Sequence, residues 1–182
     1  MGLDGYKIRD QQAVHFITFA TVQWVDVLPW NDYVNIIIDS LTYCQKEKGL
    51  FIHAYCIMPN HLHLIISTVT NNLSDIIRDF KKFTSAKIIN AIMENTKESR
   101  RNCMLWIFKK AGKNNECNNN YQFWQQDNHL IECSTEEILR TRKDYLHENP
   151  MRAGFVWRAE NYRYSSAIDY YSTGKGLLNI NK

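Results

Sequence analysis

Apolar and polar positions along this chain follow two different periods, and the shorter period marks strands. Three segments rich in β-branched and aromatic residues alternate loosely or form short apolar runs, at residues 15–24, 50–57 and 61–69. The second and third are separated by Met58-Pro59-Asn60, where proline fixes φ and asparagine tolerates turn geometry. We therefore expect these two segments to form an antiparallel hairpin.

The longer period marks three helices. Apolar residues recur at helical spacing over about 33–48 and 74–94, and a third helix opens with the capping-box sequence at 134–137. This last helix should end close to Asn149, because Pro150 disfavours helical geometry at the residue before it.

The segment between the second and third helices is less regular. Residues 96–121 include a polar run at 114–120, and we interpret 96–121 as an insertion or loop. The pairs Phe123-Trp124 and Leu130-Ile131 indicate a fourth strand. The resulting order predicts an α+β fold, an antiparallel β-sheet with helices packed on it and a ferredoxin-like or RRM-like core. Residues 1–182 contain no sharp boundary, so we expect one domain.

The composition is that of a folded protein. Of 182 residues, 45% are hydrophobic and 23% are charged, which suits one domain with a real core. The apolar runs are too short to span a bilayer, and the N-terminus lacks the layout of a secretory signal, so we expect a cytoplasmic protein without a membrane partner. The five cysteines form no C-x-x-C pair, and we expect buried free thiols.

Positive charge is concentrated in one part of the chain. Residues 78–113 contain ten Lys and Arg against three Asp and Glu, a local net charge of +7 in a chain whose total is +3. Such asymmetry is typical of a basic face that binds a polyanion. A solvated helix face would have the same composition, and charge alone does not choose between them.

Two histidines stand one residue apart at the start of the third predicted strand. Because side chains alternate along a strand, His61 and His63 should point to one face of the sheet and Leu62 to the other. Two imidazoles on one face can chelate one metal ion. An arbitrary H-x-H is more commonly a pair of half-buried structural histidines, so the spacing leaves both interpretations open.

A second pair lies on the third predicted helix. Tyr145 and Asn149 are four residues apart, so they share one side of the helix, one turn from each other. Ile138, Leu139 and Leu146 occupy the same broad side, and on spacing alone a core tyrosine with an exposed hydroxyl is the favoured alternative.

The two pairs together suit attack on a phosphodiester. A metal ion held by two histidines and a third neutral ligand polarises phosphate oxygens and orients the phosphate. A tyrosine hydroxyl beside it can attack phosphorus and form a covalent ester. The phosphotyrosine bond conserves the energy needed to rejoin the strand.

Several blocks of the sequence, in the right order, resemble the single-tyrosine HUH transposase family (insertion-sequence type) and its REP-associated tyrosine transposase branch. The HUH signature is found at residues 54–65, and the tyrosine-helix motif at residues 144–156. Two further blocks are typical of the branch. One is residues 162–167, and the other is residues 123–125 with His129. The resemblance covers about 15–171, the HUH core.

The resemblance implies an HUH pair on a central strand and a nucleophile on a later helix. It implies that His61, His63 and Asn149 bind Mg²⁺ or Mn²⁺, that Tyr145 is the nucleophile, and that His129 is a further active-site candidate. Cleavage of single-stranded DNA, often hairpin-forming, would leave a 5′-phosphotyrosine and a free 3′-OH. Relatives act as monomers or homodimers.

DNA contacts are expected from basic side chains for the phosphates and aromatic rings for the bases. Ordinary surface lysines and core tryptophans are the alternatives. The candidates are Arg78, Lys81, Lys82, Lys87, Arg100, Arg101, Lys109 and Lys110, with Trp106 and Trp124 as stacking partners.

Three function classes follow. The favoured one is a transposase or domesticated DNA-processing enzyme, because all four catalytic positions are filled. The second is a domesticated DNA-binding protein without turnover. The third is an unrelated small metalloenzyme with a strand H-x-H in a barrel, against which the long helices argue.

Overall fold

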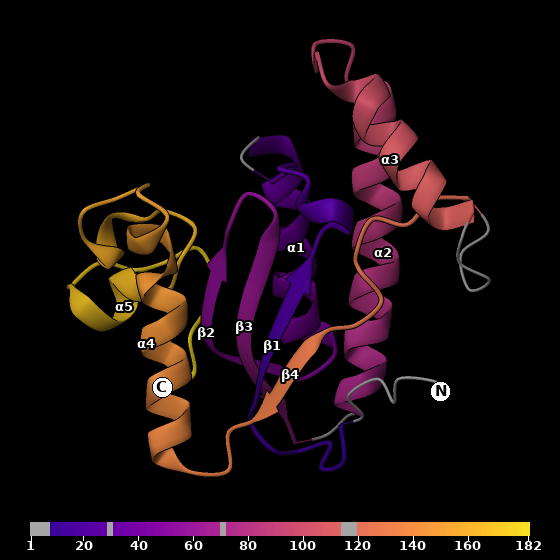
Figure 1. Ribbon diagram of the computed structural model, residues 1–182. Coiled ribbons are helices and arrows are strands. Elements are labelled where there is room, and N and C mark those ends of the chain that lie inside the picture. The colour runs from indigo at the N-terminus through magenta and orange to yellow at the C-terminus, as the bar shows by residue number, and fades with distance from the viewer. Residues whose placement is uncertain (1–7, 29–30, 70–71, 114–119) are drawn as a thin grey trace.

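The computed structural model describes residues 8–28, 31–69, 72–113 and 120–182, and the arrangement of its elements is shown in Figure 1. Within this part of the chain, four strands form one sheet in the order β2-β3-β1-β4. The strands are β1 (His15–Ala20), β2 (Leu50–Ile57), β3 (His61–Thr68) and β4 (His129–Glu132). The α-helices are α1 (Asn31–Glu47), α2 (Leu73–Glu94), α3 (Arg101–Lys113), α4 (Glu136–Arg152) and α5 (Ala167–Tyr171), with 3-10 turns η1 (Val22–Trp24) and η2 (Ala159–Asn161).

Every pairing in the sheet is antiparallel, and β3 lies inside it between β2 and β1. The expected hairpin is confirmed, since Ile57 of β2 pairs with Leu62 of β3 across the Pro59 turn. The predicted α+β fold, an antiparallel sheet with helices packed on it, is therefore confirmed.

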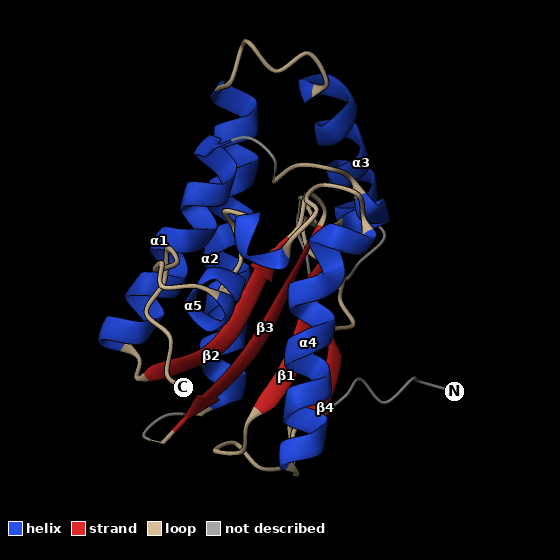
Figure 2. Cartoon of the chain, turned by 90° about the vertical axis from the view of Figure 1, so that its left-hand side faces the viewer, coloured by secondary structure: helices blue, strands red, loops and turns tan. Residues whose placement is uncertain are grey.

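Helices cover the two faces of the sheet differently, as Figures 1 and 2 show. Ile17, Phe19 and Leu64 point towards α1 and α2 and belong to the main core. On the opposite face, Phe16 and Ile65 pack with Leu146 of α4 in a smaller cluster. The alternation of strand side chains thus separates the apolar core under α1 and α2 from the face on which α4 lies.

A bulge in β2 keeps both faces supplied with apolar side chains. The register between β2 and β3 shifts between Ile52 and Ala54. Ile52 and Tyr55 therefore both lie in the main core although they are three positions apart, while Ala54 and Cys56 face α4. An extra residue in one strand inverts the alternation that follows it.

Two expected boundaries differ from the structure at N-terminal caps. The second helix is capped by Asn72 rather than Ser74, because the Asn72 side chain accepts the Ser74 N–H at 3.0 Å. The third predicted helix, which is α4 in the structure, is capped by Thr135 rather than Ser134, since Thr135 Oγ1 accepts the Ile138 N–H at 3.2 Å. In both cases the side chain that reaches a free N–H of the first turn defines the start.

The expectation that this last helix ends close to Asn149 is wrong by one turn. α4 continues through Pro150 to Arg152, and Gly154, whose φ of 77° is left-handed, follows the C-cap residue Ala153. Pro150 is buried, and its own carbonyl accepts the Phe155 N–H at 2.9 Å. One proline within the final turn is tolerated because the carbonyls around it find other donors.

The range 96–121, predicted as an insertion or loop, is helical in part. It contains α3, which buries Met104 and Phe108. Polar and basic residues on its outer side obscured this helical pattern. Most of the polar run predicted as a loop, residues 114–119, lies outside the described residues.

The first and fourth strands are shorter than their patterns. β1 ends at Ala20, and the next residues form η1. Trp124 makes only an isolated bridge to Thr21, so β4 consists of residues 129–132 alone.

Of the cysteines, Cys44 and Cys56 are the buried free thiols that were expected. Cys133 is half-buried and Cys103 is exposed, while Cys117 lies outside the described residues. No helix among the described residues is long and apolar enough to cross a membrane.

A buried histidine fastens α4 to the edge of the sheet. Nε2 of His147 lies 2.8 Å from the Ser166 hydroxyl and Nδ1 lies 3.2 Å from that of Tyr171. The Tyr55 N–H of β2 donates to Ser166 Oγ at 2.9 Å, and the Ser166 N–H donates back to the Tyr55 carbonyl at 3.0 Å. The outer edge of β2 is thereby paired, and α4 is connected to it through His147.

Because burial lowers the pKa of His147 to about 4, the folded protein keeps this ring neutral at pH values where the unfolded chain protonates it. We expect the free energy of unfolding to fall as pH decreases from about 6.5 towards 4, with this ring contributing up to about 1.4 kcal/mol per pH unit. Urea unfolding in metal-free buffer between pH 4.5 and 8 measures the slope. His147→Gln should lower the slope by up to about 1.4 kcal/mol per pH unit, whereas His129→Gln, at an exposed ring, should not; equal slopes for all three proteins would contradict this prediction.

Candidate active site

The histidine pair lies at the start of β3, on the face of the sheet covered by α4. The ring centroids of His61 and His63 are 4.6 Å apart, while Leu62 between them is buried in the main core on the other face. β3 is flanked on both sides by strands, so the backbone that carries the pair is held by two ladders.

An oxygen atom lies within hydrogen-bond distance of the Nδ1 atom of each imidazole. Nδ1 of His61 is 2.7 Å from Asn60 Oδ1, and Nδ1 of His63 is 2.8 Å from Thr18 Oγ1 on β1. When Nδ1–H donates to such an oxygen, the lone pair of the ring is on Nε2. Asn60 and Thr18 thus orient both rings with Nε2 as the donor for a ligand.

The other predicted pair meets the histidines from α4. The Asn149 amide lies with Nδ2 2.9 Å from Nε2 of His63. Tyr145, one turn earlier, has its ring 5.5 Å from the His63 ring, centroid to centroid, and is 37% exposed. The structure therefore brings together the four residues on which the sequence prediction rested, and leaves the tyrosine open to solvent.

Phe16 of β1 joins these groups and was not recognised in the sequence. Its ring stacks on His63 at 5.4 Å and meets the edge of Tyr145 at 6.1 Å. It is 1% exposed, so it fills the space between the sheet and α4 rather than contacting substrate. Phe16 and Thr18 sit two apart on one face of β1, and only their pairing with β3 places them here.

Burial keeps both histidines neutral. Desolvation lowers the pKa of His61 to about 4, and desolvation together with the nearby His61 and His129 lowers that of His63 to about 3. Asp26 opposes the shift at His61 but does not overcome it. At neutral pH the Nε2 lone pairs are therefore not blocked by protons, as metal coordination requires.

The donor set fits a divalent metal ion with a third, amide ligand. In an octahedral site with ligands at 2.0–2.1 Å, neighbouring donor atoms lie about 3 Å apart. The 2.9 Å between His63 Nε2 and the Asn149 amide matches that spacing, and a half-turn about χ2 exchanges the amide nitrogen for its oxygen. The described residues hold no cluster of three His, Cys, Asp or Glu, so a carboxylate does not compete with Asn149 for this role.

His129 lies on the same face, one strand further from the pair. Thr18 is opposite His63 on one side and His129 on the other, so these three residues form a row across β3, β1 and β4. The His129 ring is exposed and lies edge-on to Phe16 at 6.3 Å. It flanks the site and acts electrostatically on His63.

Two of the expected DNA contacts face the interior instead of solvent. Trp124 is 4% exposed, and its Nε1–H donates to Thr84 Oγ1 at 2.9 Å, so its ring face is part of the core. The Lys81 ammonium donates to the Gln125 carbonyl and to Asn128 Oδ1, both at 2.8 Å. Desolvation lowers the pKa of Lys81 to about 8, and we assign this lysine to a structural role.

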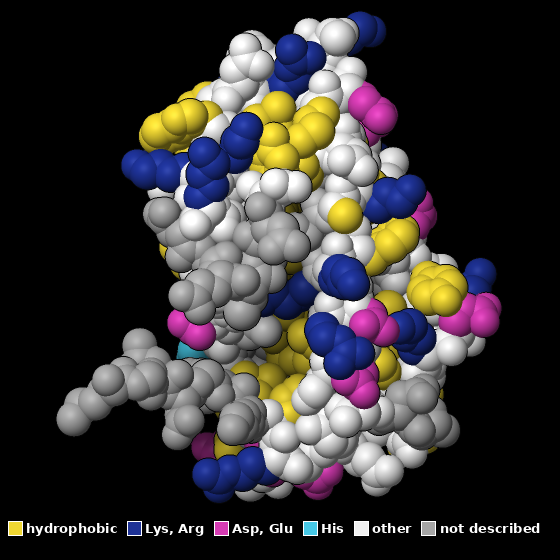
Figure 3. Space-filling view, turned by 90° about the vertical axis from the view of Figure 1, so that its right-hand side faces the viewer, with side chains coloured by type: hydrophobic (Ala, Val, Ile, Leu, Met, Phe, Trp, Pro, Cys, Tyr) yellow, Lys and Arg dark blue, Asp and Glu magenta, His cyan; other side chains and the backbone are white. Residues whose placement is uncertain are grey.

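The other basic candidates lie on α2, on α3 or just before α3, and Figure 3 shows Lys and Arg side chains over the side of the molecule on which these helices lie. Arg78 pairs with Asp75 and Asp79, and Arg100 pairs with Glu98. Trp106 is 61% exposed with the Lys110 ammonium 5.0 Å from its ring centre. Lys82, Lys87 and Lys109 are exposed, and Arg101 is half-buried.

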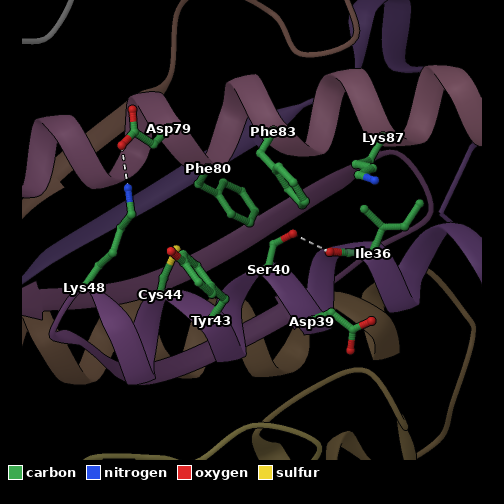
Figure 4. A pocket seen from close by; sticks show the side chains of 10 residues that line it. All are labelled: Ile36, Asp39, Ser40, Tyr43, Cys44, Lys48, Asp79, Phe80, Phe83 and Lys87. Atoms are coloured by element: carbon green, nitrogen blue, oxygen red, sulfur yellow. Dashed lines mark hydrogen bonds and ion pairs between the residues drawn. The ribbon is translucent and has the colours of Figure 1, made fainter.

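A cavity of about 650 Å³ lies between α1 and α2, on the far side of the sheet from the histidine pair. Figure 4 shows Phe80, Phe83 and Tyr43 along it and the Lys48–Asp79 ion pair at one end. None of the four predicted catalytic residues lines it, and it plays no part in the assignment of the site.

Comparison with known proteins identifies a family and a fold. Residues 14–108 match the family model described as "Transposase IS200 like". Among solved structures, a REP-associated tyrosine transposase bound to a REP hairpin aligns with a TM-score of 0.65 and 14% identity, covering 99% of this chain and 96% of that one. That likeness confirms the expected HUH transposase fold.

Other solved chains align less well, with TM-scores of 0.45. A chain described as a transposase from Deinococcus radiodurans has 14% identity, with coverage of 80% of this chain and 97% of that one. A bacterial tRNA(His) guanylyltransferase-like protein in complex with GTP has 11% identity, with coverage of 84% and 71%. No curated protein matches the chain.

The oxygen behind each histidine generates a prediction about metal affinity. Thr18→Val keeps the shape of the side chain and removes the acceptor at His63 Nδ1, so the ring loses its fixed tautomer and orientation. We expect Mn²⁺ affinity to fall by about 10- to 100-fold, the usual effect of losing such a partner. Calorimetric titration of the purified protein with Mn²⁺ measures it.

The control for this change is Ile17→Val, on the same strand but the opposite face. It shortens a buried side chain without touching the site and should leave Mn²⁺ affinity within twofold of the original. An unaltered affinity in Thr18→Val would mean that Thr18 does not orient a ligand.

Proposed function

The chain belongs to the IS200-like transposase family, and from this premise we propose that it cleaves and rejoins single-stranded DNA through Tyr145, with a divalent metal ion held by His61, His63 and Asn149. The observation that carries the proposal is the meeting of β3 and α4. The Asn149 amide lies 2.9 Å from His63 although 86 positions separate them, and Tyr145 lies beside the same ring. A core tyrosine would not require this neighbourhood.

The residues that would hold the metal are all neutral. Mg²⁺ or Mn²⁺, when bound, supplies a Lewis acid that polarises a phosphate oxygen and orients the phosphate. Imidazole ligands by themselves suit Mn²⁺ at least as well as Mg²⁺. Because none of these three ligands is a carboxylate, the ligands themselves would not offset the attraction of the ion for the phosphate. Asn60 and Thr18 hold the two rings ready for this before any ligand arrives.

Tyr145 is positioned to attack such a phosphate. Its ring is fixed on one side by contacts to Phe16 and His63 and remains partly exposed. The Arg152 guanidinium lies 5.6 Å from the ring centre and is paired with Glu148 at 2.6 Å. This combination supports a nucleophile that reaches a phosphate from solvent while its own position is held by packing.

In the proposed cleavage the Tyr145 hydroxyl oxygen forms a bond to phosphorus and the bond from phosphorus to the 3′ oxygen breaks. The hydroxyl proton leaves to solvent, and the departing 3′ oxygen takes up a proton to become a 3′-OH. The 5′ end stays on the protein as a phosphotyrosine ester. Attack by a 3′-OH on that ester reverses each step and rejoins a strand, with no external energy source.

The DNA partner is proposed to be a single strand that forms a hairpin. The structurally similar REP-associated transposase is bound to a REP hairpin, and the exposed lysines of α2 and α3 supply positive charge for a polyanion. The His pair and Tyr145 lie outside this basic region, so a strand would have to run from it to the site. REP-type sequences flanking the gene are the first candidates.

The two alternative functions fare differently. An unrelated metalloenzyme with its H-x-H in a barrel is wrong, because the sheet described here is open, four-stranded and covered by helices. A domesticated DNA-binding protein without turnover remains the alternative to test, since fold and family membership are compatible with it.

Tyr145→Phe should abolish the covalent protein–DNA adduct, because it removes the attacking oxygen, while DNA binding stays within a few-fold of the original. The measurement is a denaturing gel after incubation with Mn²⁺ and labelled single strands from the DNA flanking the gene. The matched control is Tyr43→Phe, at an exposed tyrosine of α1 on the other side of the sheet, which should form the adduct normally.

An adduct that persists in Tyr145→Phe would contradict the assignment of the nucleophile. The half-buried Tyr121 would be examined next, because Tyr55 is fully buried with its hydroxyl bonded to the Leu177 N–H. Binding without an adduct in the unaltered protein would instead favour the DNA-binding function.

His61→Ala should lower Mn²⁺ affinity by more than about 100-fold, beyond the effect of losing an outer partner, and should reduce cleavage with it. His53→Ala is the control, since His53 lies on the neighbouring strand and bonds to Ser67 and the Asn181 carbonyl. Cleavage at the original rate in His61→Ala would refute the metal site.

A further inference from the structure

We infer that Trp24 is a stacking platform for one nucleobase of the DNA strand, next to the metal-binding histidines. The inference rests on the proposed function and adds to it a specific contact with the nucleotide. It comes from an unusual turn that holds an exposed tryptophan against His61.

The backbone of this turn adopts a conformation that side chains rarely take. Gln23 and Trp24, the second and third residues of η1, both have φ of 54°, and neither is glycine. Two consecutive residues in the left-handed region are uncommon outside turns built from Gly, Asn or Asp. Such conformations persist where the surroundings fix them, and they cluster at ligand sites.

The surroundings of the turn fix it from several sides. The Val22 N–H donates to the Phe123 carbonyl at 2.8 Å, and the Thr21 hydroxyl donates to the Val25 carbonyl at 2.9 Å. The Trp24 carbonyl accepts from Asn60 Nδ2 at 3.2 Å. Asn60 is also the residue whose Oδ1 lies against His61 Nδ1, so one side chain connects the turn directly to a proposed metal ligand.

The turn presents the indole at the edge of the site. The Trp24 and His61 ring centroids are 5.5 Å apart with an interplanar angle of 72°, an edge contact. Trp24 is nevertheless 53% exposed. An apolar ring of this size, half in solvent and held by a strained turn, has area available for a flat partner.

A nucleobase is the partner that this position fits. A phosphodiester at the His61–His63 pair carries a base on each adjoining nucleotide, and unpaired bases stack on aromatic rings whatever their sequence. Charges of both signs lie near the turn, since the Arg100 guanidinium there is itself paired with Glu98. The Asp26 side chain accepts from Asn60 at 2.8 Å, and the Arg100 guanidinium donates to the Asp26 carbonyl at 2.9 Å.

The competing role for Trp24 is that of a cover that keeps His61 dry. The two roles predict different losses of binding when the Trp24 ring is removed. A cover affects metal affinity and is indifferent to the DNA bases, whereas a platform affects the binding of DNA that has a base at one position. Both losses can be measured on the same variants.

The experiment combines Trp24→Ala with DNA that lacks single bases. Labelled single strands carrying an abasic nucleotide at each position around the cleavage site are titrated with full-length protein, using fluorescence anisotropy, in a Tyr145→Phe background so that no strand is cut. At one position we expect base removal to weaken binding by about 5- to 100-fold, the equivalent of one stacked base. In Trp24→Ala that position should have no further effect, and Trp24→Phe should restore most of it.

Two controls separate the outcomes. Tyr43→Ala removes an exposed aromatic ring on α1, on the other side of the sheet, and should leave the abasic profile unchanged. Mn²⁺ affinity should remain within twofold in Trp24→Ala. A loss of Mn²⁺ affinity in Trp24→Ala with an unaltered abasic profile would show that Trp24 covers His61 and would overturn the stacking role. Equal losses at every abasic position, in the protein with Trp24 and in Trp24→Ala alike, would also overturn the stacking role.

The result is independent of whether the protein cuts DNA. If base removal at one position has its effect only when Trp24 is present, but the protein forms no adduct, this inference stands and the proposed DNA cleavage is refuted. An adduct at Tyr145 without any coupled position would do the reverse. Absence of binding to any strand in the unaltered protein would overturn both.

Discussion

The contact between the His63 ring and the Asn149 amide is the interaction on which the rest of the site depends. It joins the middle of the sheet to α4 at 2.9 Å. One turn of a helix rises 5.4 Å, so a slip of α4 by a turn would remove Asn149 from His63 and carry Tyr145 away from Phe16. The site therefore requires α4 to lie at one position along the sheet, and contacts of neighbouring residues hold it there.

The anchors of α4 lie around the site rather than in it. His147, two residues from both Tyr145 and Asn149, bonds to the segment that pairs with the edge of β2. Leu146 packs on the sheet beside Phe16. Neighbouring residues of this turn thus have different roles: Tyr145 and Asn149 face the histidine pair, and Leu146 and His147, two of the three residues between them, bind the helix to the sheet. Most positions from Tyr145 to Asn149 therefore make a contact that either forms the site or holds the helix on the sheet.

Much of the fold could be predicted from the sequence because its periods are strong. β2 begins and ends as predicted, and α2 begins one residue early. The errors arose where a local rule was overruled. Pro150 did not stop α4, since later N–H groups bond back into the last turn. α3 was taken for a loop, since only a few of its residues are buried.

The site was predictable only in part, because some of its residues are placed by strand pairing and packing rather than by a local pattern. His61, His63, Tyr145 and Asn149 stand out by spacing and by family resemblance. Thr18 and Phe16 give no such signal, because their role depends on the register that sets them opposite His63 and Ile65. Trp124 could not be told from a stacking residue until its indole was found bonded to Thr84 inside the core.

Neutrality is the constraint that connects these details. Burial disfavours charge on His61 and His63, and the third proposed donor is an amide. A buried divalent ion with such ligands is poorly compensated by the protein, so the negative charge that completes the site has to come from the phosphate itself. An aspartate in place of Asn149 would supply that charge internally and weaken the attraction for substrate. In the proposed mechanism, the neutral ligand set thus couples the metal to the DNA and leaves the nucleophile as the exposed group.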